Sequence, residues 1–283
     1  MALSSATKVR SELEIYKEKT GENADVFDFF HSVLKVQNRT YKNSRVSFRV
    51  SIAALQERLK NSQRLVKPRE ISIPRREYLE TLKRIEGEIN KRWMVGKRLK
   101  QFSRLEELNS DKFAGFISGM VSGKSGYLKG LPTKTHTKKA TLQFALESAA
   151  MPFMAKISSD VSKKVDLSLW QKGTCPVCGR YPVVAKMRKD DGARFLYCGF
   201  CATQWRFPRL TCVNCGNTDQ STMKYFFPEA DRGHRVDVCD VCKKSVRTTD
   251  ERALGRETFF EVENWVTSYL NDVAIREGYK PLG

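Results

Sequence analysis

The sequence predicts an α+β fold with a helical N-terminal domain, two small cysteine-rich β units in tandem, and a C-terminal helix. Apolar residues recur at helical spacing through roughly the first 165 residues. All eight cysteines then fall between residues 175 and 242, among short runs of β-forming residues. Helical spacing returns after residue 250. The expected domains are residues 1–165, 166–208, 209–250 and 251–283.

The N-terminal domain is expected to consist of successive amphipathic helices. Residues 47–66 are interpreted as one helix, and another begins after Pro74, because proline suits the first turn of a helix. A further helix is expected from about residue 138 to Met151. It should end before Pro152, because proline lacks the N–H that continues a helix.

The chain is strongly basic, with a formal net charge of +19. Residues 75–104 hold ten Lys or Arg against four Asp or Glu, and residues 122–139, which include His136, read as a mobile basic loop. Basic surfaces attract polyanions and acidic proteins. The charge therefore indicates the sign of a partner, although solvated helical faces are the simpler interpretation.

Cysteine usage depends on the compartment. No apolar run reaches the roughly 18 residues that span a bilayer, and the opening "MALSSATKVRSELEIYKEKTGE" has no apolar signal region. We therefore expect a soluble cytoplasmic protein with no membrane insertion. In a reducing compartment, paired cysteines bind metal or perform redox work more often than they form disulfides.

The eight cysteines form four C-x-x-C pairs, separated by 19, 10 and 23 residues. Two thiolates in one tight turn can grip a metal ion, and a second such turn completes a closed tetrahedral site of four sulfur ligands. The expected cofactors are therefore two metal ions, either zinc or rubredoxin-type iron. A thioredoxin-like redox motif is the alternative, but it would occur once rather than four times. The predicted metal ligands are Cys175, Cys178, Cys198, Cys201, Cys212, Cys215, Cys239 and Cys242.

Three pairings of the four turns are possible. A repeated glycine position favours the sequential pairing, in which the first turn pairs with the second and the third with the fourth. Gly179 and Gly216 follow the first and third pairs, whereas Ala202 and Lys243 follow the second and fourth. Glycine at this position tolerates a positive φ. This repeat predicts two zinc-ribbon or rubredoxin-like units in tandem.

No catalytic constellation is visible in the sequence. A closed site of four thiolates leaves no open coordination position for hydrolysis, so the protein is expected not to be an enzyme. His234, five residues before the last pair, is interpreted as a loop residue rather than as a donor to the metal site. Trp170 and Trp205 flank the first unit and are interpreted as packing anchors.

The cysteine region resembles the FdhE family of formate dehydrogenase accessory proteins. The resemblance rests on "CPVCGRYPVVAKM", "ARFLYCGFCATQWRFPRLTCVNCGNTD", "VDVCDVCKK" and the ending "VTSYLNDVAIREGYKPLG", and it covers about residues 166–283. It implies a helical domain with two rubredoxin-like metal folds, in a cytoplasmic iron-binding protein. It also implies that the eight cysteines are metal ligands. Family members act on the catalytic subunit of a molybdenum- or tungsten-dependent formate dehydrogenase before its export or assembly.

The expected function is that of a metal-binding accessory protein, or chaperone, for maturation of the catalytic subunit of formate dehydrogenase or a related molybdopterin oxidoreductase. A nucleic-acid-binding zinc-ribbon protein is the main alternative, because ribbons with basic helices also bind RNA and DNA. A rubredoxin-like electron carrier is the third possibility.

Overall fold

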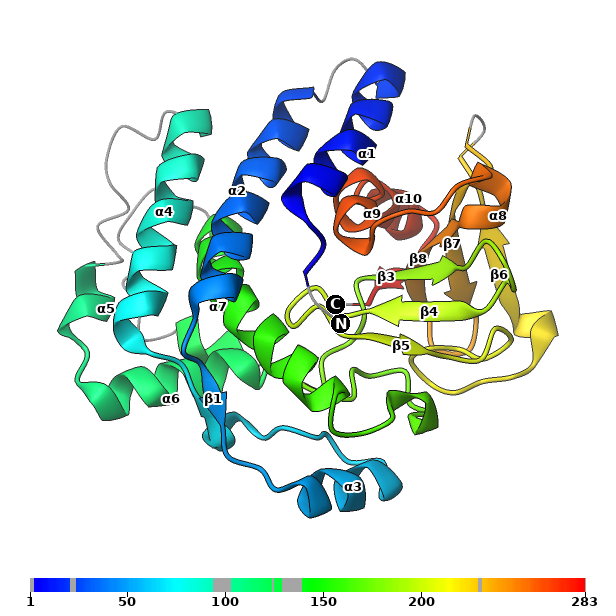
Figure 1. Ribbon diagram of the computed structural model, residues 1–283. Coiled ribbons are helices and arrows are strands. Elements are labelled where there is room, and N and C mark those ends of the chain that lie inside the picture. The colour runs from blue at the N-terminus through cyan, green and yellow to red at the C-terminus, as the bar shows by residue number, and fades with distance from the viewer. Residues whose placement is uncertain are drawn as a thin grey trace.

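The computed structural model has a helical half and a sheet half, which Figure 1 shows side by side. It describes residues 3–20, 24–93, 103–123, 125–128, 139–228 and 231–282. The predicted basic loop therefore lies largely outside the described residues, His136 included, as do residues 94–102 of the basic stretch. Among the described residues, no helix is both long and apolar enough to span a bilayer.

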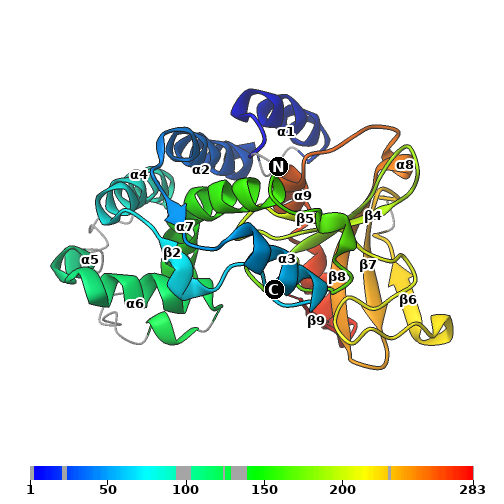
Figure 2. The ribbon, with the colours of Figure 1, turned by 60° about the horizontal axis from the view of Figure 1, so that its bottom comes forward.

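The helical half packs around α7, which is buried on nearly every side. Apolar residues from α2 and α4 pack against it, and α1 lies beside α2 (Figure 2). The strands β1 and β2 pair as a separate two-stranded sheet in this half. The elements are α1 (Ala6–Thr20), α2 (Ala24–Asn43), β1 (Ser47–Phe48), α3 (Ile52–Lys60), η1 (Pro68–Glu70), β2 (Ile71–Ser72), α4 (Arg75–Trp93), α5 (Ser103–Glu107), α6 (Ser110–Val121), η2 (Ser125–Leu128) and α7 (Lys139–Ser162).

The expectation that the last of these helices ends before Pro152 is wrong. The helix α7 continues through Pro152 to Ser162. A proline leaves the carbonyl four residues earlier without its helical donor, and here that carbonyl belongs to Ser148. The side chain of Gln37, on α2, donates a hydrogen bond of 3.0 Å to it. A neighbouring helix thus supplies the missing donor.

The predicted helix over residues 47–66 is shorter than expected. Residues 47–48 form β1, and only residues 52–60 are helical. Ser51 caps the helix by accepting a hydrogen bond from the backbone N–H of Ala54, and Ser62 turns the chain away with a φ of +50°. Leu65 and Val66 lie outside the helix, because their N–H groups donate to carbonyls of the first ribbon.

The two cysteine-rich units share one continuous sheet. The first ribbon (residues 174–206) contributes an antiparallel meander, and the second ribbon (residues 211–250) contributes another. The parallel pairing of β3 with β8 joins them, with Ala185 opposite Thr248. The strand order is β5-β4-β3-β8-β7-β6, with β9 (Lys280–Pro281) beside β8. The other strands are β3 (Val184–Met187), β4 (Arg194–Tyr197), β5 (Gln204–Arg206), β6 (Met223–Phe226), β7 (His234–Cys239) and β8 (Lys244–Asp250).

The C-terminal segment forms three short helices where the sequence predicts one. These are α8 (Glu251–Leu254), α9 (Phe260–Val266) and α10 (Leu270–Arg276). Gly255 ends α8 with a φ of +69°, a conformation that glycine adopts without steric cost. In Figure 1, α9 and α10 lie between α1 and the sheet, so this segment links the two halves of the molecule.

Candidate metal centres

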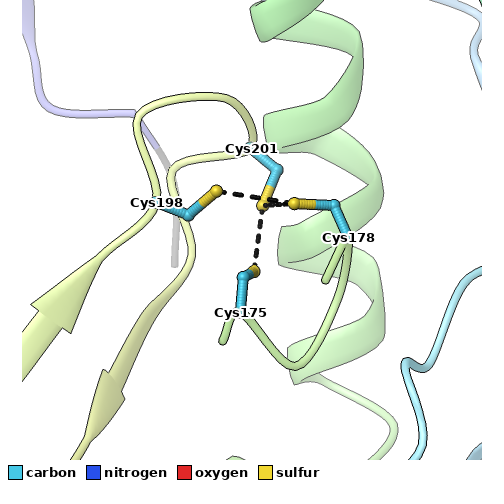
Figure 3. Close-up of side chains that lie close together, drawn as sticks. All are labelled: Cys175, Cys178, Cys198 and Cys201. Carbon is cyan, nitrogen blue, oxygen red and sulfur yellow. Dashed lines mark hydrogen bonds between the residues drawn. The ribbon is translucent and has the colours of Figure 1, made fainter. Parts of the chain in front are cut away.

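The structure brings the eight thiols together in two groups of four. The turns pair sequentially, as the repeated glycine position predicts. In the first cluster, Cys175 lies 3.5 Å from Cys201 and Cys178 lies 3.5 Å from Cys198, measured between sulfur atoms. Figure 3 shows that two loops supply these four side chains, two thiols each. All four cysteines of this cluster are buried.

The second cluster has nearly the same geometry. The sulfur atoms of Cys212 and Cys242 are 3.7 Å apart, and those of Cys215 and Cys239 are 3.8 Å apart. Within each cluster, the ligand atoms all lie within 4.8 Å of one another.

These separations fit a tetrahedral metal ion. Metal–sulfur bonds of about 2.3 Å place neighbouring sulfur atoms about 3.8 Å apart in a regular tetrahedron. A disulfide would need a separation of about 2.05 Å, and all eight cysteines are free thiols. Each cluster could therefore hold one ion with four thiolate ligands.

The same backbone turn builds all four C-x-x-C pairs. In each, the residue after the second cysteine donates its N–H to the carbonyl of the first cysteine, at 2.9–3.0 Å. That residue has a positive φ in every turn, glycine or not. The values are +78° at Gly179, +55° at Ala202, +73° at Gly216 and +53° at Lys243. The conformation that glycine suggested for two turns therefore applies to all four.

The electrostatics of the clusters favour a bound cation. Burial raises the pKa of the Cys212 thiol to about 12. At Cys239, burial acts in the same direction but is outweighed by backbone N–H groups of its own turn and by neighbouring thiols, which lower the pKa to about 7. In the first cluster, the neighbouring thiols lower the pKa of Cys175 against the effect of burial, whereas burial raises that of Cys201. Four adjacent thiolates repel one another, so a divalent ion is needed for all four to ionise.

The helical half covers the first cluster from two directions. The backbone N–H groups of Leu65 and Val66 donate to the carbonyls of the two residues between Cys175 and Cys178, at 2.8 and 3.2 Å. On the other side runs α7, the green helix behind the sulfur atoms in Figure 3. This cover closes the first cluster off from solvent.

A short hydroxyl chain joins α7 to the first cluster. The hydroxyl groups of Ser158, on α7, and Thr203 are 2.7 Å apart, and the Thr203 hydroxyl lies 2.8 Å from the sulfur of Cys201. A hydroxyl can donate a hydrogen bond to a thiolate and so stabilise its charge. The side chain of Thr203 is therefore a neighbour of the ligand set that sequence reasoning did not single out.

Arg180 also ties the first ribbon to the helical half. Its guanidinium lies 3.7 Å from the ring centroid of Phe200 and donates a hydrogen bond of 2.7 Å to Glu147 on α7. This positive charge follows the second ligand, Cys178, by two residues. It can offset part of the negative charge of a metal–tetrathiolate unit.

The tryptophans and His234, which the sequence also singled out, are not among the ligands of either cluster. Trp170 and Trp205 are buried, and each donates its indole N–H to a backbone carbonyl, as expected of packing anchors. The interpretation of His234 as a loop residue is wrong. It begins β7 and is buried, with hydrogen bonds of 2.5 Å to Asp231 and 2.9 Å to Glu263.

A cleft of about 700 Å³ opens where the helical half, the first ribbon and the C-terminal segment meet. Its lining includes Cys178 and Cys198, although both residues are buried, at 1% and 0% exposure. The rings of Phe30 and Trp265 stack in its wall with centroids 5.0 Å apart. Arg180 and Glu147 supply charged groups to the same wall.

The helical half, the shared sheet and the two clusters define the chain as a protein with two ribbon units of four cysteines each. A family model described as the central domain of FdhE matches residues 174–209, the first ribbon. Curated proteins named "Protein FdhE homolog" match as well. The protein from Aquifex aeolicus is 33% identical over 117 residues, and that from Shewanella oneidensis is 32% identical over 85 residues. These alignments cover 40% and 29% of this chain, and 41% and 28% of the relatives.

The fold comparison extends over the helical half. The crystal structure of the FdhE protein from Pseudomonas aeruginosa matches with a TM-score of 0.65, covering 92% of this chain and 87% of that one. The sequence identity is 15%, so this match concerns the fold alone. The resemblance expected from the sequence is confirmed: the chain is similar to FdhE proteins in part of its sequence and in its fold. The α+β fold class is confirmed too, with its helical domain and tandem four-cysteine ribbons.

Proposed function

We propose that this chain is a cytoplasmic metal-binding accessory protein for maturation of a formate dehydrogenase catalytic subunit, or of a related molybdopterin oxidoreductase. One observation carries the proposal: an FdhE-like fold spans nearly the whole chain and holds two four-cysteine clusters. The family model matches residues 174–209 alone, and the alignments with the curated relatives cover less than half of those proteins. The client and the role therefore belong to the proposal.

In this proposal, all eight cysteines are metal ligands and each cluster holds one ion. A bound ion would supply the positive charge that four adjacent thiolates need and a cross-link between two turns far apart in sequence. Zinc and iron both suit four thiolates in a tetrahedron. Ferric iron in such a site absorbs visible light, whereas zinc does not, so the absorbance spectrum of protein from its native host distinguishes them.

The proposed role is binding rather than catalysis. A tetrahedral ion with four cysteine ligands has no open position for a substrate or water. The cleft between the two halves offers stacked aromatic rings and charged groups on one surface, as partner-binding sites often do. We propose that the immature subunit contacts this cleft and the adjacent ribbon surface.

The test is co-purification together with a deletion strain. An affinity-tagged chain should recover the catalytic subunit of formate dehydrogenase, and deletion of the gene should abolish formate oxidation while leaving that subunit in the cell. A variant with Arg180→Ala and Trp265→Ala, both in the cleft wall, should recover less of the subunit. Recovery of no molybdopterin enzyme, together with normal formate oxidation in the deletion strain, would contradict the proposal.

The net charge of +19 favours nucleic-acid binding as the second candidate. Among the described residues, however, several cations of α4 already have acidic partners. Arg76 pairs with Glu80 at 2.9 Å, and Lys91 pairs with Glu88 at 2.8 Å. A gel-shift experiment at physiological salt separates the two functions, because nucleic-acid binding would weaken steeply as salt rises.

A further inference from the structure

The two clusters have the same geometry but very different surroundings. We propose that the first cluster is a permanent structural site and that the second is an exchangeable site, which equilibrates with metal in solution. This division of labour rests on the proposed binding of one ion per cluster. It goes further by assigning different tasks to the two sites.

The first observation is the exposure of the ligands. All four cysteines of the first cluster are buried, whereas Cys215 is exposed and Cys242 is partly exposed. The residue before the last cysteine of each ribbon shows the same contrast. Phe200 is 4% exposed in the first ribbon, and Val241 is 62% exposed in the second. A chelator can reach the second cluster from solvent without any movement of the chain.

The second observation is the cover over the turns. The first cluster is held on the helical half by backbone hydrogen bonds from Leu65 and Val66, and by a hydrogen bond of 3.2 Å from Arg64 to the carbonyl of Cys178. The second ribbon meets the rest of the chain at a different place. There, Gly173 packs so closely on its first turn that an added Cβ would lie 1.8 Å from the carbonyl oxygen of Val213.

Two polar side chains lie near the second cluster. A side-chain amide from the same ribbon, that of Asn217, lies 3.9 Å from the sulfur of Cys239. The phenol of Tyr279 donates to Asp240 at 2.7 Å, beside the last turn. Cys215 and Val241 remain exposed beside these contacts.

Exchange of a thiolate-bound ion proceeds by ligand substitution. An incoming donor replaces one thiolate at a time, and each thiolate that is released takes up a proton from water. At the second cluster, this can begin at Cys215 in the folded protein. At the first cluster, all four ligands are at most 1% exposed, including the two that line the cleft, so the chain must first open locally, and such an opening is populated rarely. Release from the first cluster should therefore be at least about 100-fold slower.

The experiment uses the full-length protein loaded with zinc. After addition of excess EDTA, released zinc is followed over time, and samples are alkylated with iodoacetamide and mapped by peptide mass spectrometry. One equivalent of zinc should leave fast, with alkylation of Cys212, Cys215, Cys239 and Cys242. The second equivalent should leave slowly, with alkylation of the other four cysteines. Release of both equivalents at one rate, or alkylation of the first cluster before the second, would overturn the inference.

Variants sharpen the assignment without removing a ligand from the buried site. Cys215→Ser should abolish the fast phase and leave the slow one. Phe200→Ala, which thins the cover of the first cluster, should speed the slow phase several-fold. The matched change at the corresponding exposed position, Val241→Ala, should alter neither rate. A slow phase indifferent to Phe200→Ala would contradict the assigned role of the cover.

The outcome also separates this inference from the proposed metal binding. Protein that holds no zinc or iron as purified, and takes up none, contradicts the proposed metal sites and this inference with them. Two bound ions that leave together contradict the division between the sites alone.

Discussion

The two ribbons differ in what surrounds them rather than in how they are built. Each contains two C-x-x-C turns that end on a residue of positive φ, and each brings four sulfur atoms to nearly the same separations. The first is enclosed by α7 and the segment after α3, whereas the second presents Cys215 and Val241 to solvent. The comparison teaches that local sequence determines the geometry of such a site and that tertiary packing determines its accessibility.

Loss of one ligand should have the largest effect, and the effect should be unequal. Cys178→Ser removes a buried ligand and leaves three thiols enclosed under the helical half, so the free energy of unfolding should fall by more than about 4 kcal/mol. Cys215→Ser loosens an exposed site and should cost about 1–2 kcal/mol. Urea denaturation followed by tryptophan fluorescence measures both, because Trp170, just before the first ribbon, and Trp205, within it, are buried in the folded protein. Equal losses would show that the two sites contribute equally to stability.

The contact between the ribbons gives the next prediction. Gly173→Ala would place a Cβ 1.8 Å from the backbone oxygen of Val213, so the two ribbons must move apart. We expect a loss of about 3 kcal/mol in the free energy of unfolding. Gly115→Ala is the control, because nothing lies within 4 Å of a Cβ built there, inside α6. It should be neutral or slightly stabilising, since alanine favours a helix.

A pH dependence follows from the buried histidine that connects the second ribbon to α1 and α9. Burial alone would lower the pKa of His234, but hydrogen bonds to Asp231 and Glu263 raise it to about 9. Tyr16, from α1, donates its hydroxyl to Glu263 at 2.7 Å and lies 3.2 Å from the imidazole. The charged imidazolium therefore holds two acidic groups in place.

Because the folded pKa of His234 is raised, its contribution is fully present below about pH 6.5 and is lost as the pH rises through 9. The expected loss is about 2–3 kcal/mol. Thermal melts between pH 6 and pH 10 measure it. In His234→Gln this slope should flatten, and an unchanged slope would assign the pH dependence to other groups.

The smallest predicted effect concerns the turn after the last cysteine. Lys243 has a φ of +53°, in a region that glycine occupies without strain. Lys243→Gly should therefore stabilise the second ribbon by about 0.5–1 kcal/mol, less the loss of the ion pair with Asp240. The parallel change Ala202→Gly should gain less, because Ala202 is buried and loses packing contacts. A melting temperature that falls in Lys243→Gly would refute the strain argument.

Much of the candidate site could be predicted from the sequence because it is local. A C-x-x-C turn specifies its own backbone, and the glycines that follow the first and third turns predicted the sequential pairing. The amphipathic helix expected after Pro74 is α4, and its buried face includes Tyr78, Leu82 and Ile85 at helical spacing. These features depend on residues within one turn or one helix.

The features that the sequence did not reveal depend on residues far apart in the chain. Pro152 stays inside α7 because Gln37 supplies the missing hydrogen bond. His234, on β7, is buried because Glu263 from α9 and Tyr16 from α1 converge on it. The parallel pairing of β3 with β8 makes one sheet of two ribbons. No periodicity or spacing records such contacts. The predicted domain boundaries remain predictions.

The central claim is that the eight thiols bind metal in two groups of four. Elemental analysis of protein purified under anaerobic conditions from its native host, combined with native mass spectrometry, tests it most directly. The account predicts two zinc or iron ions per chain and eight thiols that react with alkylating agents only after the metal is removed. Protein without bound metal, or with sulfur atoms joined in disulfides, would contradict it.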